Sequence, residues 1–206
     1  ATIVPISSEE GGVLGSIERV ENYARGHEHV YTPRQFESPS NVEAHLLTTG
    51  PEIEHQLASL GLKPTGFVAG VGTGGTVMGV GRALRKAGHR ARVVAVEPDE
   101  SAVMSGGPPG HHGIQGLADG FIPEIVQVDE IDEVVRVKTE EAIAMANRIA
   151  LEDGLLVGIS AGANVIAAKE VARRLGHEKL FPWSYEEHIG GLWEEYRQFH
   201  DNPKHR

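Results

Sequence analysis

A glycine-rich turn near the middle of the chain has the residue types that bind an anion. Gly72, Thr73, Gly74, Gly75 and Thr76 follow a short apolar run and precede a helical pattern. Glycines leave backbone N–H groups unshielded, and the start of a helix adds partial positive charge. The two threonines add hydroxyl donors. The turn is therefore a candidate phosphate-binding loop, and a tight strand–helix turn without a ligand is the alternative.

The same turn also satisfies a second motif. Gly70, Gly72 and Gly75 fit the pattern G-x-G-x-x-G, and Glu97 ends the next apolar run about where an acid that binds a ribose would fall. This arrangement is the fingerprint of a dinucleotide site. The turn alone does not decide between the two kinds of ligand.

Other polar residues are weaker candidates. Ser160 opens the last helical pattern, where a serine is most simply an N-cap. His111 and His112 are neighbours in a loop, but adjacent histidines point apart in an extended chain, and no carboxylate spacing completes a metal site. We therefore predict no metal and treat both histidines as solvated. The chain has no cysteine, which excludes disulfides and thiolate metal sites and fits a reducing compartment.

Composition excludes several classes of function. The 206 residues carry 29 acidic and 19 basic side chains, so the formal net charge is −10. Such a balance disfavours nucleic-acid binding, because phosphates are repelled. No apolar stretch approaches the roughly 18 residues that span a membrane. The first six residues lack the pattern of a signal peptide and start within a strand-like run, so we expect the chain to begin inside a fold.

Strand-like and helical patterns alternate along the chain. The strand-like runs are at 2–6, 29–32, 66–70, 92–97, 133–138 and 155–159. The helical patterns are at 13–24, 42–60 (interrupted by Pro51), 76–87, 139–153 and 160–175, with Thr139 as an expected N-cap. Alternation predicts an α/β fold with a doubly wound, mostly parallel sheet and helices on both faces. Ligands bind at the carboxyl ends of such strands, where the turns after Ala69 and Ile159 both lie. The long loop, residues 101–123, is rich in Gly, Pro and His, and we expect it to be functional or disordered.

Several segments together resemble one family of enzymes. Residues 35–41 and 48–53 precede the glycine-rich turn, and residues 105–107, 114–116, 120–123 and 158–162 follow it, in the order found in the cysteine synthase (O-acetylserine sulfhydrylase) and cystathionine β-synthase family. These are pyridoxal-phosphate enzymes of fold type II, similar in fold to the tryptophan synthase β subunit. The resemblance implies a remnant of a smaller N-terminal domain at 1–40, a larger cofactor-binding domain at 41–178 and an atypical aromatic tail at 179–206.

The resemblance also implies roles for particular residues. Residues 72–76 match the loop that binds the phosphate of pyridoxal 5′-phosphate, and Ser160 matches the residue that hydrogen-bonds the pyridine nitrogen. Gln35 matches a substrate-binding glutamine, and Gly116 matches a glycine that lines the active-site cleft. The reaction implied is β-replacement of O-acetylserine with sulfide, which yields cysteine and acetate. Residues 114–117 contain no arginine, which mildly favours O-acetylserine over phosphoserine.

Two departures from the family pattern qualify this interpretation. The family's Schiff-base lysine lies upstream in a motif like Ser-Val-Lys-Asp-Arg, and the chain has no such motif. We therefore assign no catalytic residue and expect the chain alone to be inactive. The lysines found in other contexts are Lys63, Lys86, Lys138, Lys169, Lys179 and Lys204. The second departure is the tail at 179–206.

Two alternatives to an enzyme of this family stay open. One is a non-catalytic remnant that binds pyridoxal phosphate or a partner protein, and the other is a dinucleotide-binding domain. The family implies a cytoplasmic location, a homodimer in the full-length enzyme, and docking of the C-terminal tail of serine acetyltransferase.

Overall fold

The computed structural model describes residues 3–7 and 9–176, so the predicted tail at 179–206 lies outside the described residues. The helices are α1 (Gly12–Arg25), α2 (Pro39–Ala44), α3 (Gly50–Ser59), α4 (Gly75–Lys86), α5 (Thr139–Asp153) and α6 (Ile159–Arg174). The strands are β1 (Gly66–Gly70), β2 (Arg92–Pro98) and β3 (Glu133–Val137). Three short elements complete the described chain: the π-helix η1 (His45–Thr49) and the 3₁₀ turns η2 (Asp99–Ser101) and η3 (Val128–Glu130).

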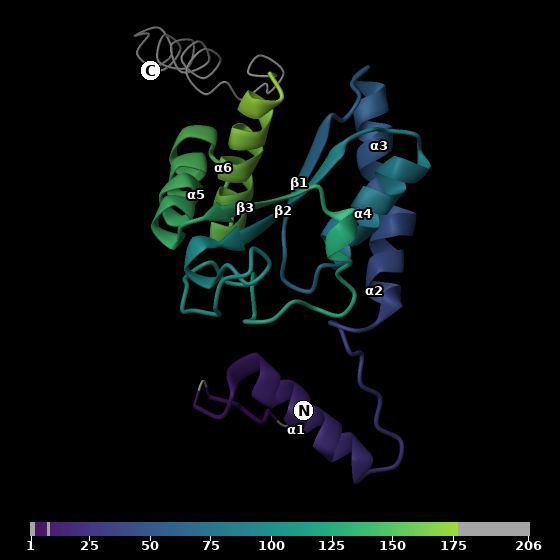
Figure 1. Cartoon of the computed structure of the whole chain (residues 1–206), viewed down its shortest axis with the longest axis vertical. Coiled ribbons are helices and arrows are strands. Elements are labelled where there is room, and N and C mark those ends of the chain that lie inside the picture. Colours follow the sequence, from purple (N-terminus) through teal and green to yellow (C-terminus); the bar gives the residue numbers. More distant parts are fainter. Residues whose placement is uncertain (1–2, 8, 177–206) are drawn as a thin grey trace, which may run out of the picture.

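The three described strands form one parallel sheet in the order β1-β2-β3. Successive side chains of a strand point to opposite faces, so central β2 supplies both cores. Val94 and Val96 pack on the side of α5 and α6, whereas Val93 and Ala95 pack on the side of α4. Figure 1 shows α5 and α6 on one side of the sheet and α2, α3 and α4 on the other. The predicted α/β class with helices on both faces is confirmed.

The helical run from residue 39 to 59 is continuous, in contrast to the expected break at Pro51. Proline has no N–H, which is costless in the first turn of a helix, where that group has no intrahelical partner. Pro51 is the second residue of α3, and the π-helix η1 ends two residues before it, so the missing N–H coincides with a change of helix type. The wider hydrogen-bond spacing of the π-helix accommodates the proline, so α2, η1 and α3 follow one another without a gap.

Three predicted strands do not form. Among the described residues, 3–7, 29–32 and 155–158 have no strand, and residue 159 begins α6. The sequence pattern at 155–159 is apolar, yet 51% of Leu155 and 95% of Leu156 are exposed. A strand exists only by pairing with another strand, and the three described strands pair with each other alone.

Helix α1 lies apart from the sheet. Figure 1 shows it below the main body, joined to α2 by an extended segment. None of its residues is buried, and Leu14 and Val20 are about half exposed. The extended segment ends at α2, which starts beside the predicted boundary at residue 40. The division into two domains remains a prediction.

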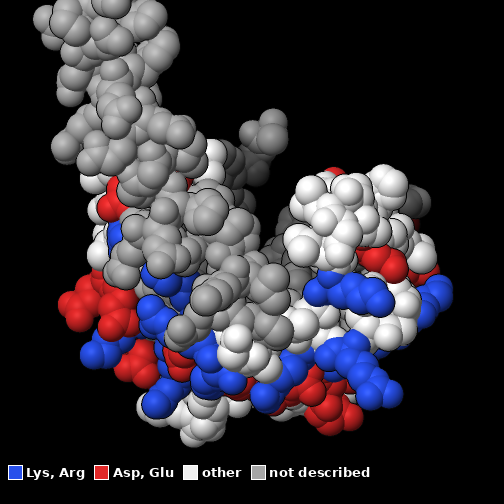
Figure 2. All heavy atoms as spheres, turned by 90° about the horizontal axis from the view of Figure 1, so that it is seen from above, with Lys and Arg blue, Asp and Glu red and all other residues white. Residues whose placement is uncertain are grey.

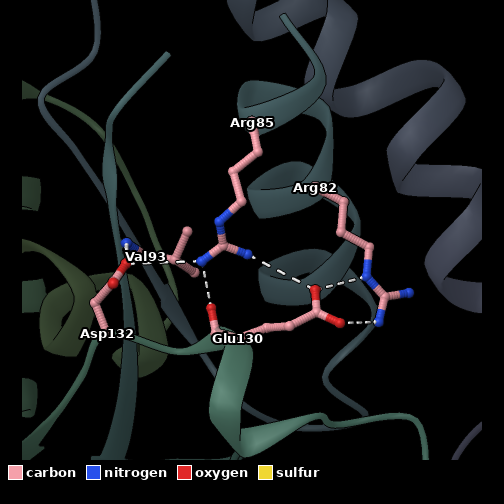
Figure 3. Close-up of polar contacts among 5 residues, drawn as sticks. All are labelled: Arg82, Arg85, Val93, Glu130 and Asp132. Carbon is pink, nitrogen blue, oxygen red and sulfur yellow. Dashed lines mark hydrogen bonds and ion pairs between the residues drawn. The ribbon is translucent and has the colours of Figure 1, made fainter. Parts of the chain in front are cut away.

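A polar network fixes α4 to the segment that precedes β3 (Figure 3). Arg82 donates two hydrogen bonds to the Glu130 carboxylate, at 2.8 and 2.6 Å. Arg85 donates to the Glu130 carbonyl, and Asp132 accepts a 2.7 Å hydrogen bond from the backbone N–H of Val93 in β2. The hydrogen bonds from Arg82 hold the pKa of Glu130 below its ordinary value. This network orients α4, whose opposite end carries the glycine loop.

The described surface is mixed in charge and partly apolar. Figure 2 shows basic and acidic side chains interspersed on the face seen from above. A groove of about 640 Å³ follows the outer edge of β1 and is lined in part by Leu57, Leu62, Val68 and Val171. Within the described residues, no helix has the length and apolar character needed to cross a membrane.

Candidate functional site

The glycine loop, residues 72–76, lies at the carboxyl end of β1, where α4 begins. Gly74 is the N-cap of α4 and has a φ of 88°, a left-handed conformation that favours glycine. The N-cap residue Gly74 has no side chain to cap the helix, and the N–H of Gly75 donates a long 3.4 Å hydrogen bond to Oγ1 of Thr73. The first N–H groups of a helix have no intrahelical acceptor and carry partial positive charge, so those that follow Gly75 at the start of α4 are donors that a ligand can use. The loop can therefore accept an anion such as a phosphate ester.

Asn41 connects the loop to Gln35, the predicted substrate-binding residue. Its Nδ2 donates 2.8 Å to the Gln35 carbonyl oxygen and 2.9 Å to Oγ1 of Thr73. Gln35 is exposed and lines a hollow of about 230 Å³ beside α1. One asparagine at the start of α2 thus brings the segment before the helix and the glycine loop together.

Thr76, the second threonine of the loop, is contacted by His45 of η1. Oγ1 of Thr76 lies 3.2 Å from Nε2 of His45, and Nδ1 of the same ring lies 2.9 Å from Oγ1 of Thr49. A neutral imidazole donates through one nitrogen and accepts through the other, so His45 orients the Thr76 hydroxyl. Both predicted hydroxyl donors, Thr73 and Thr76, therefore sit in defined positions at the loop.

Gly116 contacts the glycine loop directly. A methyl group added to Gly72 would lie 2.3 Å from the Gly116 carbonyl oxygen, so the two backbones touch. Two residues later, the N–H of Ala118 donates a 2.9 Å hydrogen bond to the Val71 carbonyl. The Leu117 side chain packs against Gly70 between these contacts. The predicted cleft glycine and the predicted phosphate loop are therefore adjacent.

Glu97 has a different role from the one that a dinucleotide site would give it. It is 1% exposed, and its carboxylate accepts hydrogen bonds from the N–H groups of Met104 (2.7 Å) and Ser105 (3.0 Å) and from the Ser105 hydroxyl (2.5 Å). A buried carboxylate with three donors is not available to a ribose. Glu97 instead anchors the start of the long loop, and this geometry weighs against the dinucleotide alternative.

Ser160 lies at the same edge of the sheet without touching the glycine loop. It is the second residue of α6, whose N-cap is Gly158, so the expectation that Ser160 could act as the N-cap is wrong. Its hydroxyl makes no hydrogen bond within the described part of the chain, which leaves it free for a ligand. One turn further on, Asn164 lies against Gly70, the last residue of β1. Thr139 is likewise not an N-cap, because Lys138 holds that position and the Thr139 hydroxyl accepts from the N–H of Gly113.

The two loop histidines differ. His111 is exposed as predicted, whereas His112 is half-buried and its Nε2 lies 3.2 Å from the Ala118 carbonyl oxygen, so the expectation that it is solvated is wrong. Near it, burial raises the pKa of the Asp119 carboxyl, and the charge of His112 acts in the opposite direction. No group of three or more possible metal ligands occurs among the residues that the structure describes.

Sequence reasoning overlooked four residues of this site: Asn41, His45, Asp119 and Glu97 in its anchoring role. Asn41 and His45 act on threonines 32 and 31 positions away, and such contacts leave no local pattern. Asp119 had one usable signal, because a carboxylate three residues after a predicted cleft glycine is a candidate for acid–base chemistry.

Comparisons with known proteins agree with this geometry. Residues 1–180 match the family described as pyridoxal-phosphate dependent enzyme. A cysteine synthase of Staphylococcus aureus (strain Mu50 / ATCC 700699) is 44% identical over 165 residues, which cover 80% of this chain and 52% of that protein. The chain thus spans about half the length of the curated relatives it matches.

Solved structures give the same result. A hydrogen sulfide-producing enzyme from Fusobacterium nucleatum matches with a TM-score of 0.82 and 44% identity over 86% of this chain and 53% of that one. Its aspartate-to-asparagine mutant, complexed with an α-aminoacrylate intermediate, matches with a TM-score of 0.83. A cysteine synthase from Entamoeba histolytica has a TM-score of 0.75 and 35% identity, over 84% of this chain and 50% of that one.

Proposed function

Because the chain belongs to the family of pyridoxal-phosphate-dependent enzymes, we propose that it forms the cofactor-binding part of an enzyme of the cysteine synthase type. The reaction is β-replacement, in which O-acetylserine and sulfide give cysteine and acetate. The observation that carries this proposal is the meeting of Gly116 with the glycine loop, at the sheet edge where the free Ser160 hydroxyl also lies.

The residues of the glycine loop fit the phosphate of the cofactor. In the proposal, the N–H groups at the start of α4 and the hydroxyls of Thr73 and Thr76 bind its oxygens, with the helix dipole as a further attraction. When bound, pyridoxal phosphate supplies an electron sink for the substrate's α-carbon, which lets the β-substituent leave. Ser160 hydrogen-bonds the pyridine nitrogen without a charge, so the ring is not held protonated as a carboxylate would hold it.

The substrate lies between the glycine loop and the long loop in this proposal. Gln35, whose backbone carbonyl accepts a hydrogen bond from Asn41, binds the substrate from one side, and Gly116 lines the other side, where the lack of a side chain leaves room. In the same proposal, residues 1–40 belong to a smaller domain and residues 41–178 form the cofactor-binding domain. The relatives are about twice as long, so the activity is that of the whole protein.

Product analysis tests the proposed reaction. The assay uses the whole protein of which this chain is the proposed cofactor-binding part, because the chain alone is expected to be inactive. That protein is incubated with pyridoxal phosphate, O-acetylserine and sulfide, and cysteine and acetate are quantified by mass spectrometry. We expect both products in equal amounts, in a manner dependent on the cofactor. Ser160→Ala should change turnover, whereas Ser59→Ala, an exposed serine on α3, should not. A wild-type protein that binds the cofactor but makes neither product would refute the proposal in favour of a non-catalytic remnant.

A second candidate function is release of hydrogen sulfide from cysteine. The TM-score of 0.82 to the Fusobacterium nucleatum hydrogen sulfide-producing enzyme exceeds the 0.75 to the Entamoeba histolytica cysteine synthase, as does the sequence identity. The two reactions act on the same β-carbon and differ in leaving group and nucleophile. Sulfide formation from cysteine, measured with and without an added thiol, distinguishes them by the ratio of the two rates.

We propose three further properties on the basis of the family. They are a homodimer, a cytoplasmic location, which the lack of cysteines suits, and docking of a serine acetyltransferase C-terminal tail in the substrate cleft. Sedimentation of the protein with and without a peptide of that tail tests the first and third. Competition between the peptide and O-acetylserine is the expected result.

A further inference from the structure

Asp119 is held at the mouth of the glycine loop by the three residues that precede it. Gly116 touches Gly72, Leu117 packs on Gly70, and Ala118 donates its N–H to the Val71 carbonyl. Adjacent Cα atoms are about 3.8 Å apart, so Asp119 begins one residue from the strand end that carries the loop. Its place is thus set by the same contacts that build the proposed site.

The backbone before Asp119 is strained. Ala118 has a φ of 48°, a left-handed conformation that costs a residue with a Cβ about 1–2 kcal/mol. Two hydrogen bonds maintain this conformation. The Ala118 N–H donates to the Val71 carbonyl, and the Ala118 carbonyl oxygen accepts from the His112 ring. Backbone strain of this kind is concentrated at functional sites.

The environment of the carboxyl suits a proton acceptor. Asp119 is half-buried, and within the described residues its carboxylate accepts no hydrogen bond, in contrast to Glu97 with three donors and Glu100 with the Thr139 N–H. Burial raises the pKa of Asp119, while His112 lowers it in part. His112 acts on both Asp119 and Glu100. Burial raises the pKa of Glu100, but hydrogen bonds from Thr139 and from its own backbone, together with the charge of His112, lower it below its ordinary value.

We propose that Asp119 is the base that takes the proton from the nucleophile as it adds to the substrate. This inference rests on the proposed function and specifies one of its steps. The sulfur of a thiol or sulfide forms the new bond to the β-carbon, and its S–H bond breaks as the proton passes to the Asp119 carboxylate. The electron pair displaced from the β-carbon would pass to the electron sink that the cofactor supplies. In the reverse direction, protonated Asp119 returns the proton to the departing sulfide.

The two half-reactions separate this role from a structural one. Loss of acetate from O-acetylserine needs no proton from the nucleophile, whereas addition of the nucleophile does. We expect Asp119→Asn to leave acetate release within about twofold of wild type and to slow addition by about 100-fold or more, the usual contribution of a general base. The matched control is Glu124→Gln, the same change of carboxylate to amide at an exposed position of the same segment.

A measurement without the cofactor provides a second readout. Burial raises the pKa of both Asp119 and Asp153, so carbon-13 NMR of the aspartate carboxyls in the cofactor-free protein should show two groups that titrate above the ordinary aspartate range. Asp153→Asn removes one of these two signals and so assigns the other to Asp119. The wild-type addition rate should fall as the pH drops through the same value, because only the carboxylate accepts a proton. Because the assignment uses Asp153→Asn, this measurement also applies if Asp119→Asn does not fold.

Each outcome decides between the two proposals. Addition slowed in Asp119→Asn but not in Glu124→Gln, with acetate release intact, supports the inference. Equal loss of both half-reactions, or an addition rate equal to wild type, overturns it while the proposed function stands. Both half-reactions are measured in the whole protein, and a whole wild-type protein that releases no acetate from O-acetylserine overturns the proposed function itself.

Discussion

Gly72→Ala is the sharpest test of the contact between the glycine loop and Gly116. The added methyl group would lie 2.3 Å from the Gly116 carbonyl oxygen, so one backbone must retreat by about 0.7 Å to reach even 3.0 Å. Neither partner is a flexible side chain, and overpacking of this kind costs about 1–3 kcal/mol. For a chain of this length, that cost lowers the Tm by about 2–12 °C. The widened loop should also lose hydrogen bonds to a bound phosphate.

The assay compares pyridoxal phosphate with pyridoxal, which lacks the phosphate. Loss of one charge-assisted hydrogen bond is about 1.5–3 kcal/mol, so Kd for pyridoxal phosphate should rise about 10-fold or more, with Kd for pyridoxal nearly constant. Gly26→Ala is the control, because its added methyl has ordinary contacts from 3.7 Å and its φ of −93° suits any residue. An unchanged Tm and cofactor affinity in Gly72→Ala would refute the contact. Equal weakening of both ligands would show general damage to the fold.

Three other substitutions test the polar contacts. Asn41→Ala removes the hydrogen bonds to Thr73 and to the backbone before α2, and should weaken pyridoxal phosphate binding about 5-fold, as measured by isothermal titration calorimetry. Glu97→Gln places an amide N–H₂ against donors, and should lower the free energy of unfolding in urea by about 2–3 kcal/mol. Glu130→Gln should cost about 1 kcal/mol at pH 7, since this pair with Arg82 is about one-third exposed. Because the pKa of Glu130 is lowered in the folded state, its stabilisation is present above the ordinary glutamate pKa and lost as the pH falls through the folded value. The difference between wild type and Glu130→Gln should therefore shrink below about pH 4.

The sequence predicted the elements that its local patterns determine. The apolar run before the glycine loop and the apolar run that ends at Glu97 are β1 and β2, and α4, between them, begins one residue from its expected start. Gly154 ends α5 with a φ of 68°, as a glycine after a helical pattern predicts. These features depend on neighbours in sequence, so the sequence is sufficient to locate them.

The parts that were missed depend on distant residues. The run at 155–159 has a strand's composition, but a strand requires a partner, and residues 155–158 have none among the described strands. The position of Thr73 is set by Asn41, 32 residues earlier, and polar contacts over such distances have no periodicity to detect. Ser160 was expected to be a possible N-cap because a serine at a helix start favours that place, yet backbone geometry assigns it to Gly158.

The long loop shows how an irregular segment can form a precise wall of a site. It has little secondary structure, but polar contacts hold it at intervals: Glu97 accepts from Met104 and Ser105, and Ser101 accepts from the Gly110 N–H. The segment up to Ala118 is then fixed to the end of β1. Because breaking a hydrogen bond of a buried backbone group is costly, each of these contacts restricts the movement of the loop. Gly116 and Asp119 therefore owe their positions to these hydrogen bonds as well as to the packing of Ile114 and Leu117 in the core. A change as remote as Glu97→Gln should consequently slow the addition of sulfide that we propose Asp119 assists.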